Sequence, residues 1–153
     1  LGMIAVIAAV LGFEHLGGFT PCKLCLGQRE PYYAAIPIAA LALFSALFKW
    51  PACLTRGTLA ITGLLMIYAM ILGIHHAGVE WAWWAGPTDC GGGTTIENAD
   101  DLLGSLTKVK PPSCNDAAGR FLGLSFAGYN VIVSAILALI AFMGAFKAEN
   151  QAR

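Results

Sequence analysis

The chain of 153 residues is rich in apolar side chains: 58% of its residues are hydrophobic, 12% are charged, and the formal net charge is zero. Soluble domains carry roughly a quarter charged residues, so this composition excludes an ordinary water-soluble domain and indicates lipid as the solvent. The sequence shows no nucleic-acid-binding signature, no glycine-rich phosphate loop and no Ser/His/Asp set, which excludes those function classes.

Long uncharged blocks predict an all-α fold, a four-helix transmembrane bundle that forms one membrane domain over residues 1–153. The predicted spans are about 1–16, 31–48, 57–76 and 121–146. The block 31–48 has no charge over 18 residues, and a helix of that length reaches about 27 Å, enough to cross the hydrocarbon layer. The first block is short and begins without Met, so we expect the sequence to start inside a helix; a cleaved signal peptide is the alternative.

The connectors between the predicted spans give the orientation. Segments 49–56 and 147–153 hold four Lys/Arg in few residues, whereas 17–30 and 77–120 spread five over a longer stretch that also holds acids. Dense basic residues favour the cytoplasmic side of a membrane. We therefore expect both termini in the cytoplasm, and 17–30 and 77–120 as loops that share the outer face.

The long outer loop is expected to contain short surface helices. Three tryptophans within residues 81–84 suit the headgroup zone of a bilayer. Residues 96–106 have apolar positions spaced like a short amphipathic helix with acids on the other side, which predicts a segment lying along the membrane.

Four of the five cysteines fall in the two outer segments, and only Cys53 lies in the inner connector. Disulfides persist in oxidising compartments, which agrees with this placement. Cys53 has no partner on its own side, so we interpret it as an inert thiol in apolar surroundings.

The first outer pair is the C-x-x-C motif formed by Cys22 and Cys25. Such a pair is reactive when a nearby cation or helix N-terminus stabilises the thiolate, and Lys23, Arg29 and a helix starting near Pro31 offer both. A low thiol pKa is therefore expected. Half of a zinc site and a structural disulfide are the alternatives, while haem attachment is excluded because no His follows the motif.

The second outer pair, Cys90 and Cys114, lies in glycine- and proline-rich sequence. The two are separated by 23 residues, and a bridge between them would constrain the loop by roughly 3 kcal/mol on the entropic model. A purely structural staple is therefore one interpretation. Two pairs on one membrane face favour the other, electron exchange between the pairs.

Several motifs together resemble the DsbB family of disulfide bond formation proteins. They are Pro-Cys-Lys-Leu-Cys-Leu-Gly-Gln-Arg at 21–29, Gly-Ile-His-His-Ala-Gly-Val-Glu at 73–80, the two loop cysteines, and Phe-Leu-Gly-Leu at 121–124. The resemblance spans nearly the whole chain. It implies a bacterial inner-membrane enzyme that reoxidises a periplasmic, thioredoxin-like DsbA protein and passes the electrons to ubiquinone or menaquinone.

The resemblance also implies roles for the four outer cysteines. Cys90 and Cys114 would meet the partner, with Cys90 as the site of the mixed disulfide. This pair would then exchange with Cys22 and Cys25, and Cys25 would face the quinone. No metal site is expected under this interpretation.

Two further residues are candidates for quinone binding. Arg29 follows Cys25 by four residues, one turn if a helix has begun there, and its charge would stabilise the reacting group. His76 matches the position at which the family places a quinone-contacting histidine, with His75 as a weaker rival. Glu14, at the outer end of the first span, is interpreted as an interfacial polar residue or a proton relay.

Two features depart from the family pattern. Lys23 inside the C-x-x-C motif is expected to raise the reduction potential, and Gly119 stands where a bulky residue is expected before the last span.

Two other functions are compatible with the sequence. One is a thiol–quinone enzyme of the vitamin K epoxide reductase type; the other is a non-enzymatic membrane protein whose outer cysteines hold zinc or staple the loop.

Overall fold

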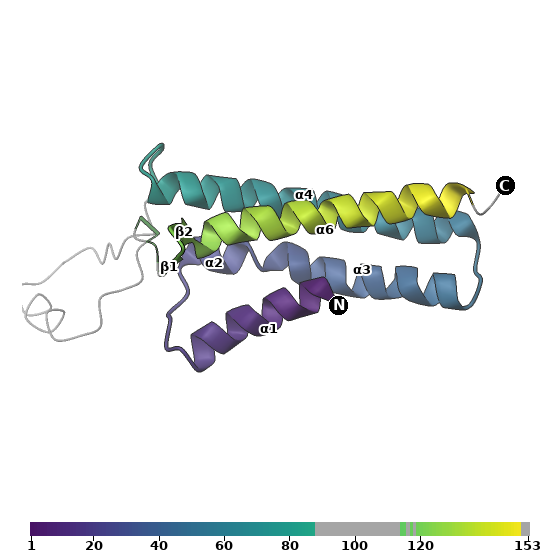
Figure 1. Ribbon diagram of the computed structural model, residues 1–153, viewed down its shortest axis with the longest axis horizontal. Coiled ribbons are helices and arrows are strands. Elements are labelled where there is room, and N and C mark those ends of the chain that lie inside the picture. The colour runs from purple at the N-terminus through teal and green to yellow at the C-terminus, as the bar shows by residue number, and fades with distance from the viewer. Residues whose placement is uncertain (88–113, 116, 118, 151–153) are drawn as a thin grey trace, which may run out of the picture.

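The computed structural model describes residues 1–87, 114–115, 117 and 119–150 and is mostly helical (Figure 1). The elements in chain order are α1 (Gly2–His15), α2 (Lys23–Gly27), α3 (Glu30–Leu47), α4 (Ala52–Glu80), β1 (Arg120–Phe121), β2 (Leu124–Ser125) and α6 (Phe126–Asn150). The predicted all-α class is confirmed, with one short β-hairpin added. Cys90 and the predicted surface helix at 96–106 lie outside the described residues.

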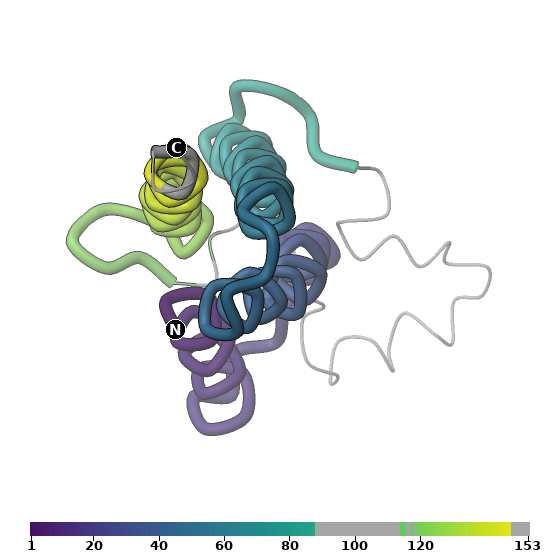
Figure 2. The backbone as a smooth tube through the Cα atoms, turned by 90° about the vertical axis from the view of Figure 1, so that its right-hand side faces the viewer, coloured from purple at the N-terminus to yellow at the C-terminus, as the bar shows by residue number. Residues whose placement is uncertain are grey.

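In the part of the chain that the structure describes, three helical segments are long and apolar enough to cross a membrane: Lys23–Leu47, Ala52–Glu80 and Phe126–Lys147. They run alongside one another in Figure 1, and the view along their axes in Figure 2 shows α4 between α3 and α6. The first predicted span, about 1–16, is shorter than these three. Helix α1 has 14 residues, about 21 Å, less than the roughly 30 Å of hydrocarbon, and it slants away from the other three.

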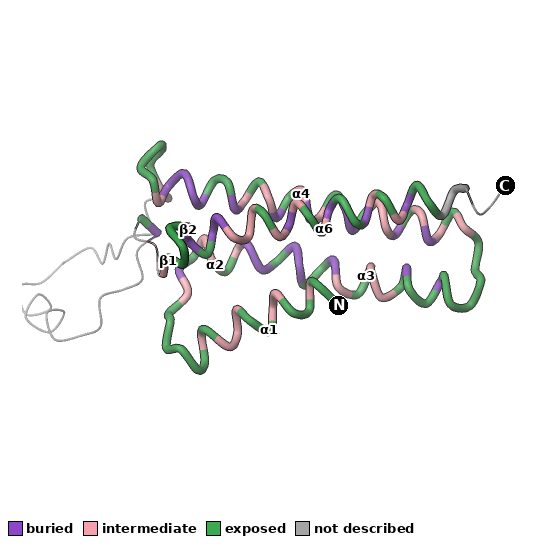
Figure 3. The backbone as a smooth tube through the Cα atoms, in the orientation of Figure 1, coloured by how far each residue is buried: buried purple, intermediate pink, exposed green. Residues whose placement is uncertain are grey.

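Small residues allow the three long helices to approach closely. The buried core cluster has three alanines, Ala35, Ala69 and Ala138, beside the larger Tyr32 and Met66, while large apolar side chains such as Leu64 and Ile136 point outward. Figure 3 shows the buried positions recurring along α3, α4 and α6, whereas α1 has none. Small residues inside and large apolar ones outside are the pattern of helices that pack in lipid.

Hydroxyl groups add polar links between helices α3 and α4. The Ser45 and Thr55 hydroxyl oxygens lie 2.6 Å apart and both residues are buried. Thr58 and Thr62 donate to carbonyl oxygens one turn earlier in α4, so their hydroxyls are satisfied inside the helix. Hydrogen-bonded hydroxyls suit an apolar solvent, because a polar group without a partner there costs free energy.

The helix of the last predicted span, about 121–146, begins later than the sequence indicates. Phe121 lies in β1, which pairs with β2 in an antiparallel hairpin, and α6 begins at Phe126. The turn uses Leu122 at φ 49° and Gly123 at φ 83°. Two successive positive φ values match the twist of a two-residue hairpin turn. Because this stretch is apolar, the sequence pattern indicated a continuous helix there and not a turn.

Other predicted boundaries also shift. Helix α4 exceeds the predicted span 57–76 at both ends. Its first turn therefore includes Cys53, which is an exposed free thiol rather than one in apolar surroundings. The predicted outer loop 17–30 contains a helix of its own, α2. At one end of the molecule lie α2, the hairpin and the end of α4, and at the other lie the α3–α4 connector and the end of α6 (Figure 1).

Candidate thiol site

The Cys22–Cys25 pair sits at the start of helix α2. Cys22 is the N-cap residue, and its sulfur accepts a hydrogen bond from the Cys25 backbone N–H at 3.2 Å. Both side chains are free thiols, with sulfur atoms 2.6 Å apart. Because the sulfurs already face each other, a disulfide can form without rearrangement of the helix.

Hydrogen bonds hold the pKa of the Cys22 thiol well below its usual range, at about 4. The largest cause is the bond from the Cys25 side chain; burial opposes it, and a bond from His76 adds to it. The low pKa agrees with the sequence-based expectation. Of the expected causes, the cations Lys23 and Arg29 are not among the groups that lower it, whereas a helix N-terminus contributes through the Cys25 backbone N–H at the N-cap of α2.

His76 is buried in helix α4, at 3% exposed, and lies against the thiol pair. Its Nε2 atom is 3.6 Å from the Cys22 sulfur and 3.7 Å from Glu80 Oε1. Its Nδ1 atom is 2.6 Å from Gln28 Nε2. The structure therefore brings His76 to Cys22, a contact that the sequence did not predict. His75, the weaker candidate, is exposed and stacks on Trp84.

Glu80 completes this group on α4. Its side chain is 4% exposed, and among the described residues its Oε2 atom accepts no hydrogen bond. Glu80 was not among the site residues predicted from the sequence. Its spacing of four residues from His76, which places both side chains on one helical face, is the sequence signal that could have identified it.

Arg29 lies at the N-cap of α3 and is 9% exposed. The helix that carries Cys25 ends at Gly27, so a single helix does not carry both residues as the spacing had indicated. Arg29 Nη1 instead donates to Glu14 Oε2 of α1 at 2.5 Å. Within the described part of the chain, the buried Arg29 Nε has no acceptor, so this N–H remains available to a ligand.

Cys114 comes to the same place from the other outer segment. It is disulfide-bonded and fully buried, at 0% exposed. It packs in one cluster with Cys22 and Val79, and Cys25 lies against that cluster. The structure thus gathers three of the four predicted catalytic cysteines, while Cys90 lies outside the described residues.

The tryptophan segment after α4 folds back on that helix. Trp84 donates from Nε1 to the His75 carbonyl at 2.9 Å, and its ring covers Gly78. A hollow of about 670 Å³ lies between this segment, Glu80 and Asn115. Of the residues around the thiol cluster, Val79 and Glu80 line this hollow.

Gly119, the departure noted in the sequence, also has a structural reason. A Cβ atom there would lie 2.8 Å from the Phe126 ring. The ring occupies the space that a larger side chain would need.

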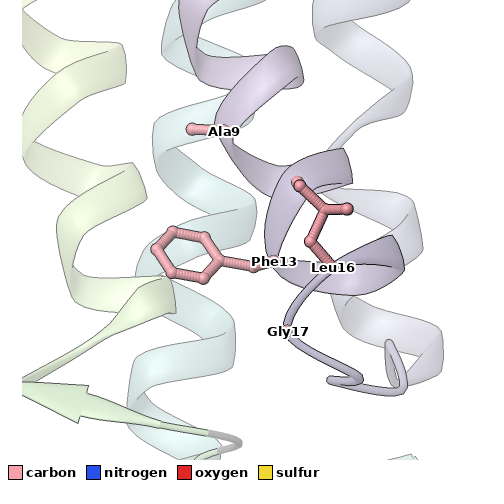
Figure 4. Close-up of a pocket in the computed structure, with 5 residues that line it drawn as sticks. Ala9, Phe13, Leu16 and Gly17 are labelled. Carbon is pink, nitrogen blue, oxygen red and sulfur yellow. The ribbon is translucent and has the colours of Figure 1, made fainter.

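Two other kinds of binding site can be compared with the thiol pair: a metal site at the thiols and an apolar hollow on α1. The ligand atoms of Cys22, Cys25 and His76 lie within 4.8 Å of one another, a set that could hold a metal ion. However, sulfurs 2.6 Å apart are closer than two sulfur ligands on tetrahedral zinc, about 3.8 Å, and fit a thiol pair better. A separate open hollow on α1 is lined by Phe13, Leu16 and small residues and contains no thiol (Figure 4).

Comparison with known proteins identifies the family. A family model described as "Disulfide bond formation protein DsbB" matches residues 1–144. "Disulfide bond formation protein B" of Aromatoleum aromaticum is 31% identical over 94% of this chain and 88% of its own length. "Disulfide bond formation protein B 1" of Pseudomonas putida is 30% identical over 99% of this chain and 90% of its own length. No solved structure matches the chain. The chain is a multi-pass membrane protein and belongs to the DsbB family, the membrane disulfide oxidoreductases that reoxidise DsbA.

Proposed function

We propose that this chain carries electrons from a periplasmic DsbA-type protein to a membrane quinone through two cysteine pairs, Cys90–Cys114 and Cys22–Cys25. The supporting observation is the buried cluster in which Cys114 packs against Cys22 beside Cys25. Thiol–disulfide exchange needs the attacking thiolate to reach a disulfide sulfur. A loop cysteine buried against the C-x-x-C pair meets that requirement.

The electrons enter through the loop pair. A partner thiolate attacks Cys90 of the Cys90–Cys114 disulfide, the S–S bond breaks, and Cys114 leaves as a thiolate. The partner's second thiol then displaces Cys90, so the partner departs with a disulfide. Both loop cysteines are now reduced by the two electrons that the partner has lost.

Exchange between the pairs follows. The Cys114 thiolate attacks Cys22 of a Cys22–Cys25 disulfide, and Cys25 leaves; Cys90 then attacks Cys114 and restores the loop disulfide. The two electrons now reside on Cys22 and Cys25 as thiols. The described arrangement, with both of these thiols free and Cys114 in a disulfide, corresponds to this state.

Cys25 is the exit for the electrons, because it is more exposed than Cys22. A bound ubiquinone or menaquinone supplies a two-electron, two-proton acceptor. Arg29 fits such a ligand, since its buried Nε–H has no acceptor among the described residues and a quinone carbonyl is one. His76 is a second contact in this proposal; because its Nδ1 lies against Gln28, a quinone would share the Nε2 side of the ring with Cys22 and Glu80.

The same proposal includes the membrane arrangement. The chain is a single integral membrane domain with both termini in the cytoplasm and both cysteine pairs on the periplasmic side of the bacterial inner membrane. Supporting this, the α1–α2 connector, α2 and the hairpin lie at one end of the helices, and the α3–α4 connector lies at the other (Figure 1).

A turnover assay tests the function. Purified protein is mixed with reduced DsbA and a soluble ubiquinone or menaquinone analogue, and loss of quinone absorbance is followed. Turnover is expected to vanish in Cys25→Ser and Cys114→Ser and to persist in Cys53→Ser, the matched control. Comparing the two analogues identifies the quinone. Undiminished turnover in Cys114→Ser would contradict the proposed route, and about one zinc per chain without turnover would favour the metal site instead.

A further inference from the structure

A chain of hydrogen bonds connects helix α6 to the Cys22 sulfur. The Tyr32 hydroxyl donates to Asn130 Oδ1 at 2.8 Å, and Asn130 Nδ2 donates to Gln28 Oε1 at 2.7 Å. Gln28 Nε2 then lies 2.6 Å from His76 Nδ1, and His76 Nε2 lies 3.6 Å from the Cys22 sulfur. The chain thus runs from Tyr32 of α3 to Asn130 of α6, then to Gln28 at the C-cap of α2, and through His76 of α4 to the N-cap of that same short helix.

One carbonyl fixes the direction of these bonds. The Asn130 amide also lies 3.4 Å from the Ala69 carbonyl oxygen in α4. A carbonyl oxygen only accepts, so the Asn130 atom beside it is the nitrogen, and that same nitrogen must donate to Gln28. Gln28 therefore presents its oxygen to Asn130 and its N–H₂ to His76.

The consequence falls on the histidine tautomer. An amide nitrogen has hydrogens and no accepting lone pair, so the His76 Nδ1 atom facing it must be the acceptor. In a neutral imidazole with Nδ1 accepting, the proton is on Nε2. The Nε2–H then points to the region shared by the Cys22 sulfur and Glu80 Oε1.

We infer that Gln28, oriented by Asn130, is a positioning residue that holds His76 as an Nε2–H donor toward Cys22. The donor is in place whichever redox state the thiol pair adopts, because its direction is set from α6 and not by the sulfur. Preorganised donors of this kind lose little free energy when charge develops on the acceptor.

The surroundings of Cys22 agree with this assignment. Gln28 is 8% exposed and His76 is 3% exposed, so water competes little for these bonds. Among the described residues, the titratable groups facing Cys22 are Cys25 on α2 and His76 on α4, and Glu80 lies next to His76. Cys114 packs there as a disulfide and does not titrate. A hydrogen-bond donor from α4 is therefore a cause of the low Cys22 pKa, second to the Cys25 side chain.

The tautomer can be measured directly by nitrogen NMR of histidine-labelled protein in detergent, with the His76 signal assigned by its loss in His76→Gln. In the wild type, Nδ1 is expected to be unprotonated with the thiol pair reduced and also with it oxidised. In Gln28→Glu, the carboxylate accepts instead of donating, so Nδ1 should gain a proton. A protonated Nδ1 in the wild type, or an unchanged Nδ1 in Gln28→Glu, would overturn the inference.

Thiol reactivity gives a second readout. In Gln28→Met, which keeps the side-chain length but has no N–H₂, the pH midpoint of Cys22 alkylation should rise by about one unit, a tenfold loss of thiolate below it. Trypsin cleaves after Lys23 and so separates Cys22 from Cys25 for mass spectrometry. Tyr32→Phe is the matched control: it removes a bond of the chain, but Ala69 still orients Asn130, so the midpoint should stay in place.

These measurements separate the inference from the proposed function on which it rests. Neither the NMR spectrum nor the alkylation profile requires DsbA or a quinone. If the wild type showed the expected His76 tautomer but no turnover with DsbA and quinone, the result would count against the proposed function alone. An unshifted midpoint in Gln28→Met would count against the role of Gln28 alone.

Discussion

His76 Nε2 lies 3.6 Å from the Cys22 sulfur, so a histidine of the long helix α4 contacts the N-cap residue of the five-residue helix α2. The contact ties the reactive motif to the best-packed helix pair, because α4 packs along α6. A short helix by itself is marginal in water or at an interface. The position of the Cys22 sulfur therefore depends on α4.

The first prediction concerns the pH dependence of Cys22. Since its pKa is lowered from 9.0 to about 4, the thiolate persists as the pH falls through the range in which an ordinary thiol is protonated. The alkylation rate should stay nearly constant between roughly pH 5 and 8 and decline only near the lowered pKa. In His76→Phe the decline should move to higher pH.

Cys53 provides the internal control for that experiment. It is exposed and free, so its alkylation in the same sample shows that the reagent is active. A Cys22 alkylation rate that already falls through the range in which an ordinary thiol is protonated would contradict the lowered Cys22 pKa.

The second prediction concerns the ion pair of Arg29 with Glu14. The two side chains are 11% and 25% exposed, so removing one partner leaves a mostly buried charge. Glu14→Gln should lower stability in detergent by about 1–3 kcal/mol and loosen α1. Thermal unfolding measures the first effect and proteolysis after α1 the second. Glu30→Gln, at an exposed acid, is the control and should change neither.

The sequence predicted the apolar helices and the C-x-x-C motif well, because both are local patterns. Uncharged blocks report burial in lipid directly, and they located α3, α4 and most of α6. They did not locate the hairpin before α6, since an apolar run gives no sign of where the backbone turns. Leu122 adopts positive φ there, a conformation that its residue type does not favour.

The candidate site shows the same division between local and long-range information. Proximity of Cys22 and Cys25 follows from their spacing. The Gln28–His76 and Glu14–Arg29 contacts join residues that are 48 and 15 positions apart, so they depend on how the helices pack. Asn130 is an amide inside an apolar helix, a residue type that is typical of polar contacts between membrane helices, and its bond to Gln28 is a contact of this kind.

The third prediction concerns Trp84, whose ring covers Gly78. In Gly78→Ala, the added methyl group should displace the indole and break its 2.9 Å bond to the His75 carbonyl. The expected cost is about 1–3 kcal/mol, with a shift in tryptophan emission. Trp84→Phe loses the hydrogen bond without creating a clash, so Gly78→Ala/Trp84→Phe should be less destabilised than the sum of the two single changes. Strict additivity would contradict the contact.

The fourth prediction tests close packing of α4 on α6. A Cβ atom on Gly73 would lie 2.9 Å from Val131 Cγ2 and 3.3 Å from the Ala127 carbonyl oxygen. The backbone atom cannot rotate away, so Gly73→Ala must push the helices apart, at a cost of about 1–3 kcal/mol.

Gly57→Ala is the matched control for Gly73→Ala, because it lies in the same helix with nothing within 4 Å of its added Cβ. Alanine is the better helix former by roughly 1 kcal/mol, so Gly57→Ala should leave the melting temperature unchanged or raise it while Gly73→Ala lowers it. The Gly73 change should also reach the site, because Asn130 Nδ2 lies 3.3 Å from the added Cβ and orients Gln28. A lowered melting temperature with an unshifted Cys22 alkylation midpoint would show that the helix interface and the thiol site are independent.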